Sequence, residues 1–198
     1  MKYVCIEGII GSGKTTLAEQ LYHYYCPKYK VSLLKERFEE NKLLELFYQE
    51  PDNYNFLVEY SFLIDRFHQI HEHIQTSNDE IIIADYCFKK CLWFAENNLP
   101  KNHFQLFKKH FLSLEKALSI QPDLLIFLDV KPDNALQNIR QRSRPMEEKI
   151  SLSYLQNLYN TYQKHIIQLN FPFHSFTLKT YNTLLDEVID TIDKTIFL

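Results

Sequence analysis

Apolar residues follow two patterns along this chain, short continuous runs and longer stretches with helical spacing. The continuous runs have the length of buried strands and predict strands at 2–7, 31–35, 80–85, 124–130 and 174–179. The other stretches repeat apolar residues every three or four positions and predict helices at roughly 14–26, 40–49, 53–76, 86–97, 101–119, 132–142, 151–169 and 181–196. This alternation indicates an α/β fold, a parallel five-stranded sheet with helices on both faces, in one domain over 1–198.

Acidic residues stand at the ends of three predicted strands. Glu36 follows the second strand, Asp85 ends the third, and Asp129 lies near the end of the fourth. Because ligands of parallel sheets gather at the carboxyl ends of the strands, we expect functional carboxylates along this edge.

The glycines mark one loop between the first strand and the first helix. The chain has three glycines where an average chain of this length has about 14. They fit the phosphate-binding motif G-x-x-x-x-G-K-[ST]. We expect the loop to bind a nucleoside triphosphate through backbone N–H groups and the helix N-terminus. The residues expected there are Gly8, Ile9, Ile10, Gly11, Ser12, Gly13, Lys14, Thr15 and Thr16.

Two side chains of this loop have specific expected roles. Lys14 is expected beside the β- and γ-phosphates, and Thr15 is expected to bind Mg²⁺ through its hydroxyl. No glycine is left to end helices elsewhere, so we expect Asn97–Asn98 and Asn170 to cap them.

The composition indicates which class of partner the chain binds. The chain has 22 Lys and Arg against 25 Asp and Glu, a formal net charge of −3. This balance favours a small-molecule substrate over nucleic acid or an anionic membrane. No apolar run approaches the roughly 18 residues of a membrane span, and the four cysteines form no C-x-x-C pair. We therefore expect a cytoplasmic enzyme.

An arginine-rich segment indicates the reaction type. Arg140, Arg142 and Arg144 alternate at the end of the predicted helix 132–142. Guanidinium groups that close over a transferring phosphoryl group stabilise its charge, so the segment favours a kinase. The alternative is a solvated charge run at a helix C-terminus. A GTPase is disfavoured because the chain has no Asn-Lys-x-Asp motif.

Further motifs accompany the loop in the order and spacing of a known family. They are Glu36, Phe47-Tyr48-x-x-Pro51, Glu59 with Arg66, Phe94-Ala95 and Arg142-x-Arg144-x-x-Glu147. From about residue 2 to about residue 166 the chain resembles the deoxynucleoside kinases, above all the bacterial deoxyguanosine kinases, which share Ile83-Ala84-Asp85-Tyr86. The resemblance implies a P-loop NTPase-type fold with an Arg-rich lid, ATP, Mg²⁺, a 2′-deoxynucleoside substrate and a homodimer.

The resemblance also implies catalytic roles. Glu36 matches the general base that takes the proton of the nucleoside 5′-OH, and Asp85 is its rival or a Mg²⁺ ligand. Members of the family have an arginine after this acidic residue, whereas this chain has Tyr86. We therefore expect Lys14 and the three arginines of the lid to bind the phosphates. Arg140 is expected to contact the nucleotide, and Arg142 and Arg144 are expected to contact the transferring phosphoryl group.

The remaining matched residues contact the acceptor nucleoside in the family. Tyr48 and Glu147 match the pair that holds the sugar 3′-OH, and Phe94 matches the aromatic that stacks on the base. Phe94 as a plain core residue is the alternative. Lys90 stands where relatives often have an aspartate near the base, and we include it among the substrate-binding residues.

Glu59 and Arg66 are expected to select the base. They lie seven residues apart, two turns along one helix face. A carboxylate only accepts hydrogen bonds, which suits the N1–H and N2–H donors of guanine, and arginine suits its O6 and N7 acceptors. We therefore expect a deoxyguanosine kinase. The alternative for these two residues is an exposed charge pair. The alternatives for the function are a broad or deoxyadenosine/deoxycytidine-preferring kinase, a thymidylate-kinase-like enzyme, and a non-catalytic nucleotide-binding module.

Overall fold

Five parallel strands form the centre of the protein. The computed structural model describes residues 1–39, 41–177 and 181–197. The strands are β1 (Lys2–Glu7), β2 (Val31–Leu34), β3 (Ile81–Ala84), β4 (Leu124–Leu128) and β5 (Phe173–Phe176). They are all parallel, in the order β2-β3-β1-β4-β5. The expected α/β class and parallel five-stranded sheet are confirmed.

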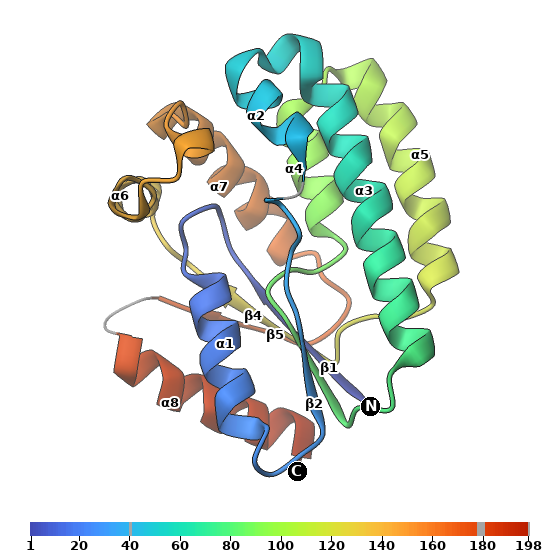
Figure 1. Cartoon of the computed structure of the whole chain (residues 1–198), viewed down its shortest axis with the longest axis vertical. Helices are drawn as coiled ribbons and strands as arrows, with labels where there is room; N and C mark the ends of the chain where they lie inside the picture. Colours follow the sequence, from blue (N-terminus) through green and yellow to red (C-terminus); the bar gives the residue numbers. More distant parts are fainter. Residues whose placement is uncertain (40, 178–180, 198) are drawn as a thin grey trace.

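Helices cover both faces of this sheet. Figure 1 shows α1 and α8 on one side and α3, α4, α5 and α7 on the other. Their bounds are α1 (Lys14–Tyr25), α2 (Lys42–Gln49), α3 (Pro51–Thr76), α4 (Lys90–Asn98), α5 (Lys101–Leu118), α6 (Pro132–Arg142), α7 (Leu152–Ile166) and α8 (Tyr181–Ile192). A short 3₁₀ turn, η1 (Pro145–Glu147), follows α6, and a π-helical turn, η2 (Asp193–Phe197), follows α8. Every residue of β3 and β4 is buried, which explains their continuous apolar sequences.

Every predicted strand and helix has a counterpart in the described residues, with shifted ends. The helix predicted at 86–97 begins only at Lys90, because the backbone N–H of Cys87 donates to the buried Glu7 carboxylate (2.7 Å) and holds a turn there. The last strand ends at Phe176, and positions 178 and 179 of the predicted strand lie outside the described residues, as does position 40 of the predicted helix 40–49.

The predicted asparagine caps are wrong. Asn97 and Asn98 are the last residues of α4, whose cap is Leu99 in an extended conformation. Asn170 lies beyond Ile167, the cap of α7. Among the described residues, the left-handed conformation that glycine usually supplies is adopted at Ser119 and Ser143, which end α5 and α6.

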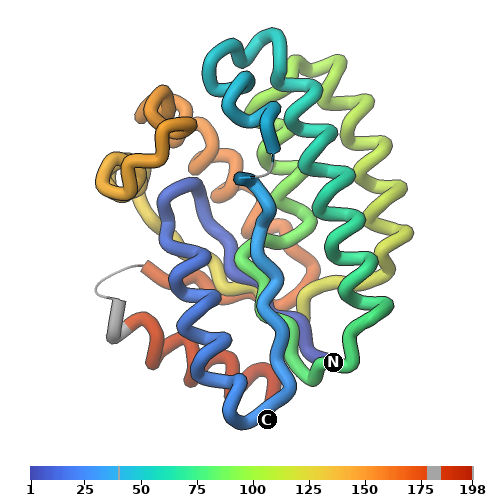
Figure 2. Tube along the Cα trace, viewed as in Figure 1, coloured from blue at the N-terminus to red at the C-terminus, as the bar shows by residue number. Residues whose placement is uncertain are grey.

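The described ends of the chain lie below the glycine loop in the view of Figure 2. There the N-terminus and the end of η2 are at the bottom of the molecule, and the loop that follows β1 is higher. The carboxyl ends of the parallel strands therefore face α2, η1 and the helices above the sheet. Among the described helices, none is both long enough and apolar enough to cross a membrane.

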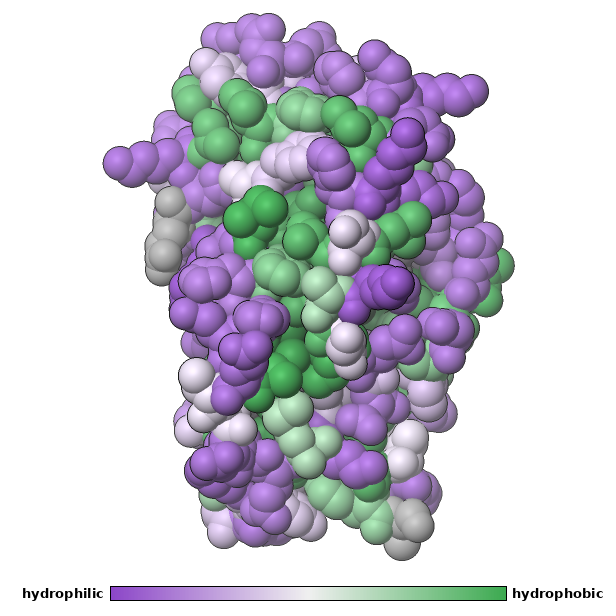
Figure 3. Space-filling view, turned by 90° about the vertical axis from the view of Figure 1, so that its right-hand side faces the viewer, coloured by the Kyte–Doolittle hydropathy of each residue, from purple (hydrophilic) through white to green (hydrophobic). Residues whose placement is uncertain are grey.

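One outer face carries exposed apolar side chains. Figure 3 shows them gathered on the side that α3 and α5 form in Figure 1. Leu57 and Ile64 on α3 are 51% and 54% exposed, and Leu106 and Leu112 on α5 are 44% and 49% exposed. We call these four residues the apolar stripe.

Candidate active site

The glycine loop joins β1 to α1, and all three of its glycines have positive φ angles. Gly13 precedes α1 in the left-handed conformation, with φ of 88°. At Gly11, with φ of 82°, a Cβ atom would lie 2.4 Å from the backbone oxygen of Ala135 on α6. The Asn138 side chain donates to the Gly11 carbonyl (2.8 Å) and ties the loop to α6. The loop is therefore held against the helix that carries the lid arginines.

Lys14 lies folded against its own loop. Its Nζ donates to the backbone oxygens of Gly8 and Ile9, both at 2.9 Å. Burial, and after it the nearby Lys90, lower the pKa of Lys14 to about 8 against the attraction of the surrounding carboxylates. A lysine at this place offers its charge to an anion that enters above the loop.

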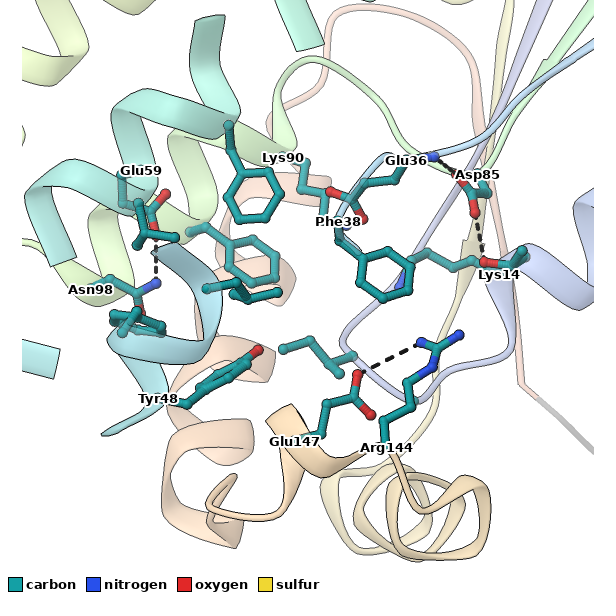
Figure 4. Close-up of a pocket in the computed structure, with 18 of the residues that line it drawn as sticks. Lys14, Glu36, Phe38, Tyr48, Glu59, Asp85, Lys90, Asn98, Arg144 and Glu147 are labelled. Carbon is teal, nitrogen blue, oxygen red and sulfur yellow. Dashed lines mark hydrogen bonds and ion pairs between the residues drawn. The ribbon is translucent and has the colours of Figure 1, made fainter. Parts of the chain in front are cut away.

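Thr15, Asp85 and Glu36 form a chain of contacts at the carboxyl edge of the sheet. The Thr15 hydroxyl donates to Asp85 Oδ2 (2.6 Å), and the backbone N–H of Glu36 donates to Asp85 Oδ1 (2.8 Å). Figure 4 shows Asp85 between Lys14 and Glu36. The structure thus brings the expected metal-binding oxygens of Thr15 and Asp85 together, beside the expected base.

Two buried cations hold the Glu36 carboxylate. Arg66 Nε donates to Oε1 at 3.0 Å, its terminal nitrogen contacts the same oxygen, and Lys90 Nζ donates to Oε2 at 2.6 Å. Burial alone would raise the pKa of Glu36, but Arg66 and Lys90 outweigh it and hold this pKa well below its usual range. Glu36 is therefore ionised at neutral pH, as an acceptor of a hydroxyl proton must be.

These groups line one end of a cleft of about 770 Å³ that opens to solvent. Figure 4 shows Lys14 and Asp85 at one end and Glu59 and Asn98 at the other, with Tyr48, Glu147 and Arg144 along one wall. The lining residues are Ile10, Gly11, Lys14, Thr15, Glu36, Phe38, Leu44, Phe47, Tyr48, Val58, Glu59, Phe62, Arg66, Asp85, Lys90, Phe94, Asn98, Arg142, Arg144, Glu147 and Tyr154.

Glu59 and Arg66 are both buried, at 3% exposed, so the alternative of an exposed charge pair is wrong. They do not pair with each other. Asn98 Nδ2 donates to Glu59 Oε1 (2.6 Å), whereas Arg66 turns to Glu36 and contacts the Cys91 sulfur (3.2 Å). Burial raises the pKa of Glu59 to about 7, although Asn98 and the two cations oppose the rise.

The wall of the cleft contains the two residues expected at the sugar. Glu147 is buried and receives two hydrogen bonds from Arg142, Nε to Oε2 at 2.7 Å and a terminal nitrogen to Oε1 at 2.5 Å. Arg144 lies 3.8 Å from Glu147 and stacks over the Phe38 ring at 4.6 Å. Tyr48 lines the same wall, and burial raises its pKa, so its hydroxyl keeps its proton.

Phe94 lies in the cleft and also packs on the core. Its ring meets that of Tyr162 edge-on at 6.2 Å, and Lys90 Nζ is 5.3 Å from its centre. It is half-buried and lines the pocket, so one side of it is available for a flat ligand.

Three expected residues lie elsewhere. Arg140 is outside the lining of the cleft, and its guanidinium donates to the backbone oxygens of Glu148 and Ile150, which holds the lid in place. Thr16 is exposed on α1. Asp129 accepts from the Tyr159 hydroxyl (2.7 Å) and belongs to the packing of α7.

Several lining residues were not predicted. Asn98 was interpreted as a helix cap, and Phe38, Phe62 and Tyr154 follow the spacing of core residues, so only their place in the fold distinguishes them. Glu7 was also missed. It is fully buried and accepts from the Tyr162 hydroxyl (3.0 Å), and burial raises its pKa.

The cleft combines a glycine loop and its adjacent lysine with paired hydroxyl and carboxylate oxygens and an ionised carboxylate. These features together define a P-loop phosphotransferase for a small molecule. The model of the deoxynucleoside kinase family matches residues 4–196. The chain belongs to this family and is a deoxynucleoside kinase that uses ATP.

Relatives with different names match at similar identity. Bacillus subtilis deoxyguanosine kinase is 33% identical over 169 residues, 84% of this chain and 79% of that protein. Dictyostelium discoideum deoxyadenosine kinase is 36% identical over 171 residues, 83% of this chain and 66% of that protein. Deoxyadenosine kinase from M. mycoides with bound dATP shares the fold, with a TM-score of 0.86 over 96% of this chain and 99% of that chain at 22% identity.

Proposed function

We propose that this chain transfers the γ-phosphate of ATP to the 5′-OH of 2′-deoxyguanosine. The observation that carries the base preference is the buried Glu59 carboxylate at the end of the cleft farthest from Lys14. In its ionised form it accepts from both N1–H and N2–H of guanine, whereas adenine and cytosine present a donor beside an acceptor. Arg66 lines the same cleft, and its guanidinium, which is bound to Glu36, adds positive charge that favours the acceptor edge of guanine.

The nucleoside then lies along the cleft with its sugar against the wall of Tyr48 and Glu147. In this pose Glu147, held by Arg142, and the Tyr48 hydroxyl bind the 3′-OH, and Phe94 stacks on the base. The 5′-OH faces Glu36, which accepts its proton as the phosphoryl group is transferred. A base of low pKa suffices because the transition state of phosphoryl transfer is loose and the nucleophile loses its proton late.

Mg²⁺ fits the oxygen pair at the other end of the cleft. The Thr15 hydroxyl and the Asp85 carboxylate are hard oxygen donors in contact with each other beside Lys14. We propose that these two residues hold Mg²⁺, directly or through water. The bound ion would neutralise charge on the triphosphate. Arg142 and Arg144 lie along the same wall of the cleft and add positive charge at the transferring group.

Lys90 provides a cation where the chain lacks an arginine. Tyr86, which follows Asp85, is fully buried, and its hydroxyl is bound to Gln69 (2.5 Å), so this position faces the core. Lys90 instead reaches Glu36 from the first residue of α4. We propose that it stabilises negative charge at the 5′ end of the nucleoside.

A broad or deoxyadenosine/deoxycytidine-preferring kinase is the second candidate. It is favoured by the raised pKa of Glu59, about 7, because a protonated carboxyl group donates as well as accepts. The experiment is a comparison of kcat/KM for the four deoxynucleosides with ATP and Mg²⁺, in wild type and in Glu59→Gln. We expect deoxyguanosine to be the best wild-type substrate, and the variant to lose at least about 100-fold on it and gain on deoxyadenosine or deoxycytidine. Equal wild-type values would favour the broad kinase.

The apolar stripe is consistent with the expected homodimer. Exposed apolar patches on a soluble protein mark contact surfaces, and we propose that the stripe packs against its copy in a second chain. Leu57→Glu combined with Ile64→Glu should halve the mass measured by sedimentation equilibrium, whereas Leu152→Glu, at an exposed position of α7, should not. A monomeric wild type would contradict the proposal.

A further inference from the structure

Glu59 is the end of a short chain of side-chain hydrogen bonds. Asn97 Nδ2 donates to Asn98 Oδ1 at 2.8 Å, and Asn98 Nδ2 donates to Glu59 Oε1 at 2.6 Å. An ionised carboxylate only accepts, so it pairs with the NH2 end of the Asn98 amide, and the Asn98 oxygen is left to accept from Asn97. Figure 4 shows the Asn98–Glu59 bond at the far end of the cleft. Glu59 therefore meets a donor here.

The other charged or titratable neighbours of Glu59 are turned elsewhere or neutral. Arg66 on α3 and Lys90 on α4 both contact Glu36, which carries the nearby negative charge. Burial raises the pKa of Cys91 on α4 to about 11 and also raises that of Tyr154 on α7, so both keep their protons. Among the described residues, Asn98 is the side chain that hydrogen-bonds to Glu59.

The proton on Glu59 changes what the cleft can recognise. An ionised carboxylate accepts twice, which matches the two adjacent donors of guanine. A protonated carboxyl group presents one donor and one acceptor, as a glutamine does, which matches adenine or cytosine. Burial favours the protonated form, and the bond from Asn98 favours the ionised form, with a resulting pKa of about 7 for Glu59. A single hydrogen bond thus acts on the choice between two base classes.

We propose that Asn98 is a positioning residue for base selection, which keeps Glu59 an ionised acceptor and so favours guanine over adenine and cytosine. The proposal rests on the proposed function, in which Glu59 contacts the base. Asn98 itself acts through Glu59, and Asn97 supports Asn98 by donating to its amide oxygen.

The test is the ratio of kcat/KM for deoxyguanosine to that for deoxyadenosine between pH 5.5 and 8.5. The titrations of Glu36 and Lys14 affect both substrates alike and cancel in this ratio. In the wild type the ratio should rise with pH, by up to about tenfold per pH unit if each form of Glu59 accepts one base only. Glu59→Gln should give a ratio that does not depend on pH.

Asn98→Leu removes the donor and keeps the size of the side chain. A hydrogen bond to a charged group corresponds to about one to two pH units, so the profile should move to higher pH by this amount and the ratio at pH 7.5 should fall by about 10- to 100-fold. Asn97→Leu should move the pH profile in the same direction by a smaller amount. In the Glu59→Gln background, Asn98→Leu should leave the flat profile unchanged.

Three results would overturn the proposal. The first is a wild-type ratio that does not change with pH. The second is an active Asn98→Leu variant whose pH profile overlays that of the wild type. The third is a fall in the ratio on Asn98→Leu that is equally large in the Glu59→Gln background. If Asn98→Leu does not fold, the wild-type and Asn97→Leu profiles decide. Absence of kinase activity on every deoxynucleoside would instead refute the proposed function, whereas pH-independent preference for deoxyguanosine would leave that function standing.

Discussion

Replacement of Glu59 by Gln should stabilise the ligand-free protein at alkaline pH. The variant keeps the shape of the side chain and an oxygen that accepts from Asn98. It removes a carboxylate whose pKa burial raises from 4.5 to about 7. Because the folded state binds this proton more tightly than the unfolded chain does, the contribution of Glu59 to wild-type stability is highest below pH 4.5 and falls as pH rises to 7.

The magnitude follows from the size of this rise. One unit of pKa corresponds to about 1.4 kcal/mol, so the full penalty above pH 7 is about 3 kcal/mol. The free energy of unfolding of Glu59→Gln, relative to the wild type, should therefore increase by about 2 to 3 kcal/mol between pH 5 and pH 8.

Urea unfolding at pH 5, 6, 7 and 8, followed by circular dichroism, measures this difference directly. Glu187→Gln, at an exposed position of α8, is the matched control and should show no such pH dependence. An unfolding difference for Glu59→Gln that is constant from pH 5 to pH 8 would refute the reasoning, because it would mean that the Glu59 carboxylate is not desolvated.

The remaining predictions concern phosphoryl transfer. Lys14→Ala should remove nearly all kinase activity, since its charge on the β- and γ-phosphates is lost, and activity within threefold of wild type would exclude that role. Glu36→Gln should lower kcat by roughly 10²–10⁴ with little change in the KM for ATP, as loss of a general base does. Asp85→Asn should raise the Mg²⁺ concentration needed for half-maximal activity. A Mg²⁺ titration that shifts for Glu36→Gln and not for Asp85→Asn would show the two roles to be reversed.

The sequence by itself determined the fold class and the place of the glycine loop. The five apolar runs become the strands because a parallel sheet covered on both faces buries nearly every side chain of its central strands. The glycine loop was predicted because its neighbours in sequence are also its neighbours in space: strand, loop and helix follow one another. The same holds for the order of Arg142, Arg144 and Glu147 in the lid.

The tertiary structure decided which charges meet. Arg66 is on the same helix as Glu59 and two turns away, but it pairs with Glu36, which follows a different strand. Asn98 contacts Glu59 only because α4 packs beside α3, and its sequence signal, an asparagine at a helix end, is that of a cap. Local spacing cannot encode such contacts.

The ionisation of the site residues was equally beyond the sequence. Two glutamates of the same cleft have pKa values displaced in opposite directions, downwards at Glu36 and upwards at Glu59. Glu59 is buried and Glu36 is mostly so, and the difference lies in their partners, two cations for Glu36 and one amide for Glu59. The residue type was fixed by the sequence, but its charge depends on burial and on neighbours that come from several distant segments.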